Sequence, residues 1–193
     1  MEANNSSRPR RRTALIVSEL SRYNVDIAAL SETRLADEGS LNEMASGYTY
    51  FWNWLPANSR RIHGVGFATK LLQTLPESPV AISERLITLR IPLEKHRYAT
   101  FISTYAPTLP SDDETKDHYY AMLRSTLMQD KLIVLGDFNA RIGSDSKIWG
   151  NVMGKNGVGK INSNGHRFPS LCSEFGLFVT NTLFKPKHKH KTT

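Results

Sequence analysis

Apolar side chains recur at helical spacing in three parts of the chain. Residues 13–23 carry them at about every third or fourth position, which predicts a helix that buries one face. Residues 112–129 show the same pattern, and Ser111 with Glu114 has the spacing of a capping box at the start of that helix. Residues 166–175 favour a shorter third helix, because a glycine follows them at once.

Other segments combine apolar runs with β-branched and aromatic residues, which favours strands. The expected strands lie in residues 25–33, 48–55, 64–70, 85–93, 97–107, 131–139 and 177–184. Because strand pairs and helices interleave, we expect a layered α/β domain with mixed sheets rather than a purely parallel sheet. Residues 141–165 are rich in Gly, Asn, Ser and Lys and are expected to form a long loop.

Composition is typical of a protein with one globular domain. The chain has 193 residues, of which 39% are hydrophobic and 22% charged. It contains no apolar run long enough to span a bilayer, and its polar, basic start is unlike a signal peptide, so no membrane partner is expected. The single cysteine, Cys172, has no partner for an internal disulfide, which favours a reducing, intracellular compartment.

The chain is basic, with 25 Lys and Arg against 18 Asp and Glu and a net charge of +7. The excess is concentrated in residues 1–12 and 185–193, which we expect to flank a folded domain spanning residues 13–184. Such segments are either disordered, solvated arms or direct contacts to a polyanion such as nucleic acid. The segment "RPRRR" near the start is also compatible with a nuclear location.

Candidate chemistry lies where two of the expected strands end. Glu32 and Asp137 each stand at the C-terminal end of a strand, so their carboxylates could converge. Mg²⁺ prefers oxygen ligands and is typically held by one or two carboxylates together with substrate phosphate oxygens. Asn139 would share the face of Asp137 in an extended backbone, and Gly136 permits a close approach. The alternative is that Glu32 and Asp137 are simply solvated acids at strand ends and bind no metal.

These residues stand in longer motifs. "LGDFNA" resembles the signature of the endonuclease/exonuclease/phosphatase superfamily, which includes apurinic endonucleases and DNase I. Further motifs run in order along the chain from about Arg11: "RRTALIVSELSRYNVDIAALSETRL", "GVGFATK", "STYAPT", "DKLIVLGDFNARIG", "NSNGHRF" and "LCSEFGLFVTNTLF". Together they resemble the reverse transcriptase-associated endonuclease domain of RTE-type non-LTR retrotransposons and the craniofacial development protein 2-like group. The resemblance implies a DNase I-like, four-layer α/β sandwich of two mixed sheets flanked by helices.

The resemblance also implies a role for each motif residue. Glu32 in "SET" would bind a metal ion, which would be Mg²⁺ or alternatively Mn²⁺, and Asp137 would share that ion and activate or hold the attacking water. Asn139 would orient the water. Tyr105 in "TYAP" would contact the phosphate near the scissile bond, with a simple packing role as its alternative. The DNA-facing residues would be Thr108, Arg34 and Arg141.

Two elements of the superfamily pattern have no counterpart in this sequence. One is a first strand of the type "TWNVR", which carries an asparagine, and the other is a C-terminal aspartate followed by a Ser-Asp-His motif. The chain begins instead with a polar arm and stops at Thr193, so we expect a domain that is truncated at both ends. The histidine normally meets charge that develops on the phosphoryl group, and groups of this kind are worth factors of about a hundred to a thousand in rate.

The expected function is therefore Mg-dependent hydrolysis of phosphodiester bonds in DNA, weak or absent in the chain as it stands. One alternative is a non-catalytic remnant that binds nucleic acid, and another is a phosphatase of the same superfamily. No small-molecule cofactor is expected, and the sequence leaves the oligomeric state open.

Overall fold

The structure is a computed structural model and describes residues 12–33, 38–43, 46–53, 64–70, 77–127 and 130–185. In chain order the elements are α1 (Arg12–Arg22), β1 (Ile27–Ser31), β2 (Gly39–Glu43), β3 (Tyr48–Asn53), β4 (Val65–Thr69), β5 (Val80–Ser83), β6 (Leu86–Pro92), β7 (Tyr98–Tyr105), α2 (Asp113–Thr126), β8 (Lys131–Asp137), α3 (Ser163–Glu174) and the 3-10 helix η2 (Thr180–Thr182). No helix within these ranges is both long enough and apolar enough to cross a membrane.

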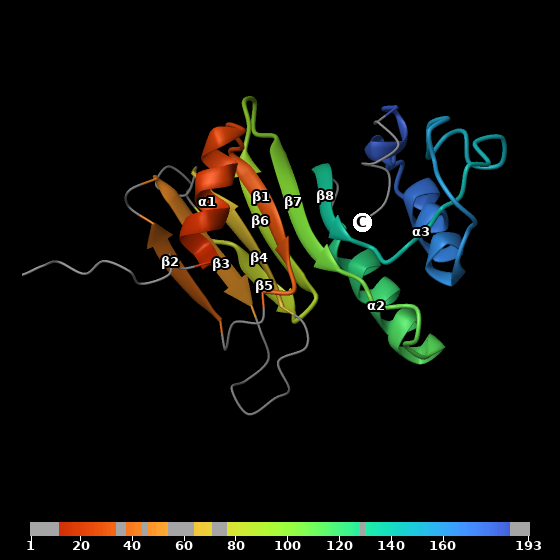
Figure 1. Cartoon of the computed structure of the whole chain (residues 1–193), viewed down its shortest axis with the longest axis horizontal. Coiled ribbons are helices and arrows are strands. Elements are labelled where there is room, and N and C mark those ends of the chain that lie inside the picture. Colours follow the sequence, from red (N-terminus) through yellow and green to blue (C-terminus); the bar gives the residue numbers. More distant parts are fainter. Residues whose placement is uncertain are drawn as a thin grey trace, which may run out of the picture.

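The strands form two four-stranded sheets (Figure 1). The first has the order β1-β4-β3-β2 and is antiparallel throughout. The second has the order β5-β6-β7-β8, and its last pair, β7 with β8, is parallel. Because parallel neighbours need a crossover connection, α2 joins the end of β7 to the start of β8.

Three apolar clusters define four layers. On the outer face of the first sheet, Val17 of α1 packs with Tyr48, Tyr50 and Ala68. Between the two sheets lies a cluster of Val65, Phe67, Ile87, Leu89 and Tyr105. The other face of the second sheet packs against α2 and α3 through Leu86, Ile102, Ala106, Tyr119, Tyr120, Leu123 and Leu171. The layer order is therefore helix, sheet, sheet, helices, as predicted.

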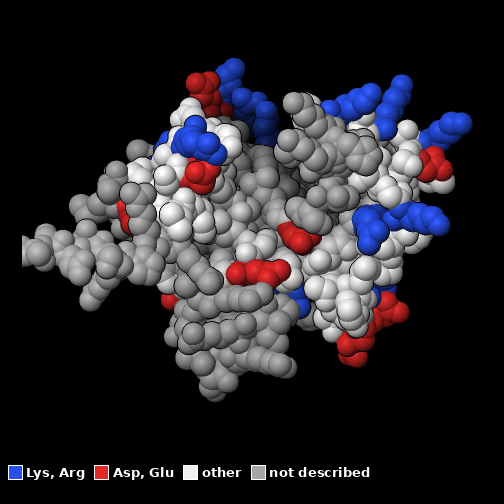
Figure 2. All heavy atoms as spheres, in the orientation of Figure 1, with Lys and Arg blue, Asp and Glu red and all other residues white. Residues whose placement is uncertain are grey.

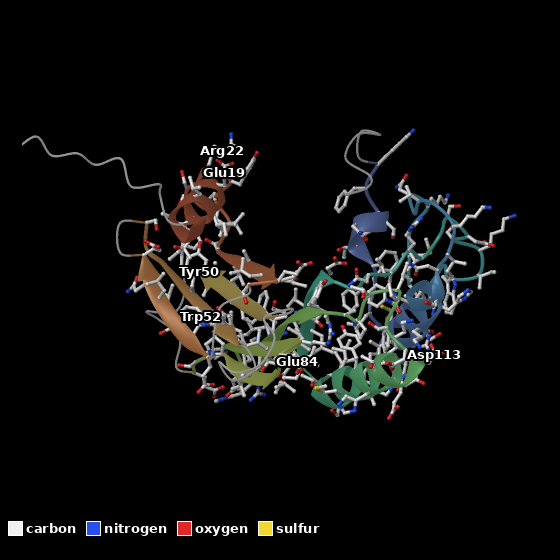
Figure 3. All side chains as sticks on the ribbon, turned by 60° about the horizontal axis from the view of Figure 1, so that its bottom comes forward. Glu19, Arg22, Tyr50, Trp52, Glu84 and Asp113 are labelled. Atoms are coloured by element: carbon white, nitrogen blue, oxygen red, sulfur yellow. The ribbon has the colours of Figure 1, made fainter. Side chains whose placement is uncertain are left out.

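Tyrosine hydroxyls fix α1 on the first sheet. Tyr50 of β3 lies on the side of the first sheet that faces α1 (Figure 3). Its hydroxyl donates to the carbonyl of Thr13 at 2.7 Å, and that of Tyr48 donates to the carbonyl of Val25. Burial raises the pKa of Tyr50 to about 12, so the phenol stays protonated and keeps its hydrogen bond at neutral pH. The first layer is therefore joined to the second by hydrogen bonds as well as by apolar contact.

Most of the expected elements are confirmed, and the exceptions have physical reasons. The segment 177–184 was predicted to be a strand and this is wrong: it forms a single β-bridge, between Met153 and Val179, and then η2. The predicted capping box is also wrong, since the cap of α2 is Asp112, whose side chain accepts from the amide of Thr115 at 2.6 Å. The strands β2 and β5 were not expected, because their sequences, "GSLNE" and "VAIS", are polar or short.

Gly136 allows β8 to lie against β7. It has φ +138, and a Cβ at this position would stand 1.9 Å from the carbonyl oxygen of Thr104, its partner in the parallel ladder. Only glycine fits such a backbone and such an approach. The last residue of β8, Asp137, is thereby brought level with Tyr105.

Gly136→Ala is expected to lower the free energy of unfolding by about 3 kcal/mol or more, because backbone strain and overpacking add at this site. Gly176→Ala is the matched control, since Gly176 also has a left-handed φ, of +62, but open space around its Cβ position; it should cost only about 1 to 2 kcal/mol. Urea denaturation followed by circular dichroism measures both. Equal losses in the two variants would contradict the proposed close approach.

Candidate active site

Three strand ends meet at one edge of the two sheets. Glu32 follows β1 directly, Tyr105 is the last residue of β7, and Asp137 is the last residue of β8. Tyr105 and Asp137 are paired in the parallel register, so their side chains stand side by side. The convergence that was expected from the sequence is therefore present, and Tyr105 lies between the two acidic residues.

Short polar side chains connect the two sheets at this edge. The hydroxyl of Ser31 on β1 donates to the carbonyl of Thr104 at 3.4 Å, and that of Ser103 on β7 donates to the carbonyl of Leu30 at 3.4 Å. These reciprocal bonds hold the end of β1 against the end of β7. In the space-filling view, acidic side chains lie near the middle of the face, between the strands and the helices α2 and α3 (Figure 2).

The phenol of Tyr105 is bonded directly to the glutamate. Its hydroxyl donates to Oε1 of Glu32 at 3.0 Å. Burial raises the pKa of Tyr105, and the hydrogen bond and the negative charge of Glu32 raise it further, whereas a hydrogen bond with the Asn139 side chain lowers it. The phenol is therefore a proton donor at neutral pH, and Asn139 belongs to the same cluster.

A tight turn follows Asp137. The backbone amide of Asn139 donates to Oδ1 of Asp137 at 2.8 Å, and the side-chain amide of Asn139 donates to the carbonyl of Ala106 at 2.8 Å. Asn139 has φ +46, so the expectation that it continues an extended backbone is wrong. Glu32 is also left-handed, with φ +53. Backbone conformations of this kind cost energy in a residue with a side chain and cluster at functional sites.

Arg85 is a buried cation beside this site that the sequence analysis did not identify. It is 8% exposed, and Nη1 donates to the carbonyl of Tyr105 at 3.2 Å while its own carbonyl accepts from the amide of Tyr105 at 3.0 Å. Burial lowers the pKa of its guanidinium. No pattern in the sequence marks this arginine, because it lies in a short turn before β6.

Of the three predicted DNA-facing residues, the structure describes two, and neither belongs to the central cluster. Thr108 is half-buried in the turn before α2, where its hydroxyl lies 3.5 Å from that of Ser111. Arg141 is exposed at the start of the long loop. Arg34 lies outside the described residues.

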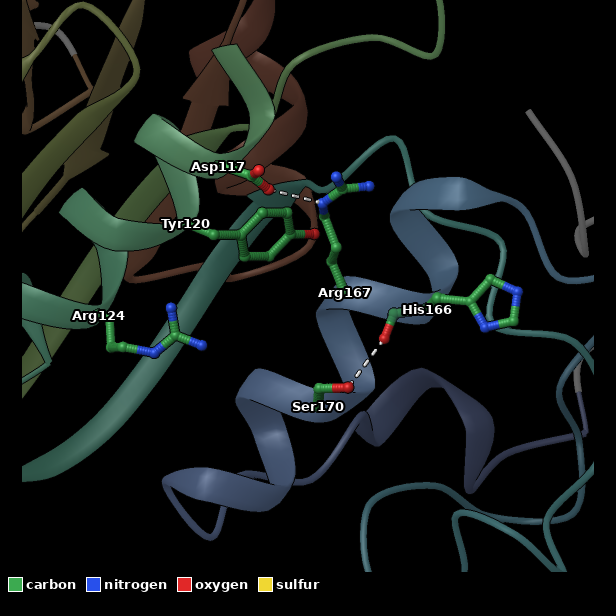
Figure 4. A pocket seen from close by; sticks show the side chains of 6 residues that line it. All are labelled: Asp117, Tyr120, Arg124, His166, Arg167 and Ser170. Atoms are coloured by element: carbon green, nitrogen blue, oxygen red, sulfur yellow. Dashed lines mark hydrogen bonds and ion pairs between the residues drawn. The ribbon is translucent and has the colours of Figure 1, made fainter. Parts of the chain in front are cut away.

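The helices α2 and α3 enclose a separate, open pocket of about 410 Å³ (Figure 4). It is lined by Asp117, Tyr120, Arg124, His166, Arg167 and Ser170. Arg167 is paired with Asp117 at 3.1 Å, and Arg124 with Glu174 at 2.8 Å. The ring of His166 points away from Tyr120 and Arg124 in the close view. This pocket contains none of the predicted site residues that the structure describes, and both of its arginines already have carboxylate partners.

The donor set of the strand-end cluster fits a hard divalent cation. Glu32 and Asp137 are both exposed and act on the same Tyr105 hydroxyl. Within the described ranges, no three or more His, Cys, Asp or Glu side chains form a group that could hold a metal ion. Mg²⁺ keeps several waters and needs only one or two carboxylates with substrate oxygens, whereas a structural zinc needs four protein ligands. Two carboxylates are therefore enough to hold a hard divalent cation together with substrate oxygens.

The chain belongs to the Endonuclease/Exonuclease/phosphatase family, whose family model matches residues 2–183. It is 30% identical to craniofacial development protein 2 of Bos taurus over 176 residues, which is 89% of this chain and 28% of that protein. The protein of the same name from Tragulus javanicus gives 30% identity over 176 residues, with 89% and 29% covered. The chain thus spans less than a third of the length of these curated relatives.

Two solved structures share the fold. The AP endonuclease LMAP from Leishmania major superposes with a TM-score of 0.54 at 11% identity, covering 85% of this chain and 61% of that one. The catalytic domain of Xenopus laevis APE2 gives a TM-score of 0.53 at 16% identity, covering 83% and 62%. The α/β fold with two sheets flanked by helices is therefore the DNase I-like fold of AP endonucleases, as predicted.

Glu32→Gln is expected to lower the pKa of the Tyr105 phenol, because glutamine removes the negative charge that disfavours the phenolate. The pKa should stay above that of an ordinary tyrosine, because burial is the largest cause and is unaffected. Ultraviolet titration of phenolate absorbance, with Tyr105→Phe subtracted, measures the change. Glu19→Gln, at an exposed acid on α1, is the control and should have no effect. A raised or unchanged pKa in Glu32→Gln would show that the bond between the two side chains does not form in solution.

Proposed function

We propose that the chain is a magnesium-dependent endonuclease domain that hydrolyses phosphodiester bonds in DNA. The observation that carries the proposal is the meeting of Glu32, Tyr105 and Asp137 at one edge of the two sheets, with the Tyr105 hydroxyl bonded to Glu32 at 3.0 Å. Membership of the family supports nuclease or phosphodiesterase chemistry, and the fold shared with AP endonucleases supports a nucleic-acid substrate.

Each side chain has a proposed role that follows from its position. Glu32 and Asp137 would hold the cation, which when bound neutralises charge on the phosphodiester and makes it more open to attack by water. Asp137 would also hold the attacking water and accept its proton, with Asn139 orienting that water. The single hydroxyl proton of Tyr105 is donated to Glu32 in the structure. Once Glu32 holds the cation, Tyr105 would donate this proton to a phosphate oxygen instead, since its raised pKa keeps the phenol protonated. A donor of this kind stabilises charge as it develops.

Exposed basic side chains on the segment that follows the Asp137 turn support a polyanionic substrate. We call residues 141–162 the 141–162 loop; it carries the exposed side chains of Arg141, Lys147, Lys155 and Lys160. Within the described part of the chain these four form no ion pair. Figure 2 shows Lys and Arg side chains projecting from the right-hand side of the view, where α3 lies in Figure 1. We propose that these four basic side chains, together with Thr108, Arg34 and the basic segments 1–12 and 185–193, contact DNA on either side of the cut bond.

Descent from an RTE-type retrotransposon endonuclease is part of the proposal. It is supported by the ordered motifs from "LSETRL" to "NSNGHRF", which extend well beyond the short signature of the superfamily. A nuclear location would follow from such an origin and from the basic segment "RPRRR".

Binding of nucleic acid without cleavage is the second candidate function. The observation that favours it is the set of exposed basic side chains on the 141–162 loop, because binding through them requires no catalytic group. Cleavage and binding assays on the same protein separate the two candidates.

The purified chain is expected to nick supercoiled plasmid DNA weakly in the presence of Mg²⁺ or Mn²⁺, because the sequence has no counterpart of the Ser-Asp-His motif. Glu32→Gln and Asp137→Asn should each reduce nicking roughly a hundredfold or more, since each removes a charge that holds the cation or the water. Glu94→Gln is the control, because this exposed acid lies in the turn between β6 and β7, at the opposite end of the second sheet. Nicking that survives chelation, or variants that nick as fast as the wild type, would eliminate the endonuclease proposal.

The basic loop is tested by the salt dependence of DNA binding. Arg141→Gln combined with Lys160→Gln should reduce the slope of log affinity against log salt by about 2, because each phosphate contact contributes about 0.9. The matched control combines Lys95→Gln with Lys131→Gln, which remove the same charge at the far end of the second sheet. Fluorescence anisotropy with a short duplex measures both slopes. If the two double variants change the slope equally, net charge and not the loop governs binding.

A further inference from the structure

Two asparagines at the start of α3 donate to the backbone of the turn that carries Asn139. The carbonyl oxygen of Asn139 accepts from Nδ2 of Asn162 at 3.3 Å and from Nδ2 of Asn164 at 3.2 Å. This turn already bonds the Asn139 amide to the Asp137 carboxylate at 2.8 Å. A shift of the Asn139 carbonyl would therefore also move the Asn139 side chain and the Asp137 carboxylate.

Asn164 connects the ends of the two site strands. It is fully buried, and Nδ2 donates a second hydrogen bond to the carbonyl of Pro107 at 2.8 Å. Pro107 follows Tyr105 by two residues, while Asn139 follows Asp137 by two. Both amide protons of Asn164 are thus used to hold the chain after β7 and the chain after β8 at a fixed separation, and the buried side chain cannot itself reach a substrate.

Asn162 combines this bond with the cap of α3. Its Oδ1 accepts from the backbone amide of Gly165 at 2.7 Å and from the backbone amide of Arg141 at 3.1 Å. The backbone amide of Asn162 donates in turn to the carbonyl of Arg141 at 3.0 Å. A Cβ at Gly165 would stand 1.8 Å from the carbonyl oxygen of Arg141, so this close approach requires glycine. The 141–162 loop is thereby closed at its base, next to the turn.

The turn needs external support because Asn139 is left-handed, with φ +46. A residue with a side chain holds such a conformation only where its surroundings determine it. The ring of Phe138 stacks on that of Phe168 in α3, with centroids 3.9 Å apart and planes at 23°. The turn is therefore fixed to α3 and its N-terminus by an aromatic contact and by two amide donors.

We propose that Asn162 and Asn164 are positioning residues that hold the turn from Asp137 to Asn139 in its productive geometry. The inference rests on the proposed function, because it assigns the pair to the same site. It places the role in the side-chain NH₂ groups, separate from the oxygen of Asn162 that caps α3. Loss of these donors should slow the chemical step and leave nucleic-acid affinity unchanged.

Asn162→Ser separates the two roles of that residue. Serine is also a strong N-cap, so α3 keeps its cap, but the donor to the Asn139 carbonyl is lost. We expect kcat for plasmid nicking to fall about tenfold and KM to stay within about twofold, because small misplacements of reacting groups lower turnover. The melting temperature should stay close to that of the wild type. Asn164→Ala should lower kcat further.

Asn156→Ser is the matched control. It makes the same change in the same loop, where Nδ2 of Asn156 donates to the carbonyl of Leu183 at 3.0 Å and does not contact the turn. It should leave kcat unchanged. The second readout is the NMR shift of the Asn139 amide proton, which is bonded to the Asp137 carboxylate: it should move in Asn162→Ser and not in Asn156→Ser.

The outcomes separate this inference from the function on which it rests. If the wild-type chain does not nick DNA at all, the proposed function fails, and the amide shift still decides whether the asparagines hold the turn. If the wild type nicks and Asn162→Ser keeps the full kcat and an unmoved amide shift, the positioning role is overturned. A loss of kcat that is matched in Asn156→Ser would likewise overturn it, because the effect would then belong to the loop as a whole.

Discussion

The parallel pairing of β7 with β8 is the constraint on which the site depends. Its register sets Tyr105 level with Asp137, and it exists only because Gly136 lets the β8 backbone lie against the carbonyl of Thr104. All other strand pairs in the two sheets are antiparallel. A parallel pair ends both strands at the same edge, so the turns that follow them also meet there. The catalytic proposal therefore rests on one ladder and one crossover helix.

The charges are arranged in a way that suits a polyanion and a cation together. Glu32 and Asp137 lie at the strand ends, and the exposed basic side chains stand on the neighbouring 141–162 loop. In the proposed function, a phosphodiester attracted by the loop would meet carboxylates, which would repel it unless a cation lay between them. The phenol of Tyr105 stays protonated in this setting, because burial raises its pKa and the nearby carboxylate charge raises it further.

Much of this could be predicted from the sequence, and the failures are instructive. Periodicity identified α1, α2 and the buried strands, because each buries a regular apolar face. It missed β5, whose side chains are largely exposed at the edge of a sheet. It also predicted a strand at 177–184, where hydrogen bonds from Gly154 and Asn156 to Thr182 and Leu183 stabilise a 3-10 turn instead. Tertiary contacts decided both cases.

The site residues also fall into those that the sequence predicts and those that it does not. Glu32, Asp137, Asn139 and Tyr105 stand in recognisable motifs, and the structure brings these four together. Arg85 and Asn164 act through burial and backbone contacts, which leave no periodic pattern in a sequence. Asn162 lies just before α3, where asparagine is a common N-cap, so its capping role does have a signal in the sequence.

The closed base of the 141–162 loop also bears on how such a chain can change over evolutionary time. Asn162 bonds the backbone of Arg141 in both directions, so the two ends of the loop stay together whatever lies between them. The entropy lost in closing a loop grows only slowly with its length. Insertions in the exposed stretch 144–148 could then accumulate without displacing the turn from Asp137 to Asn139, so related chains could vary the outer part of the loop while this turn stays constant.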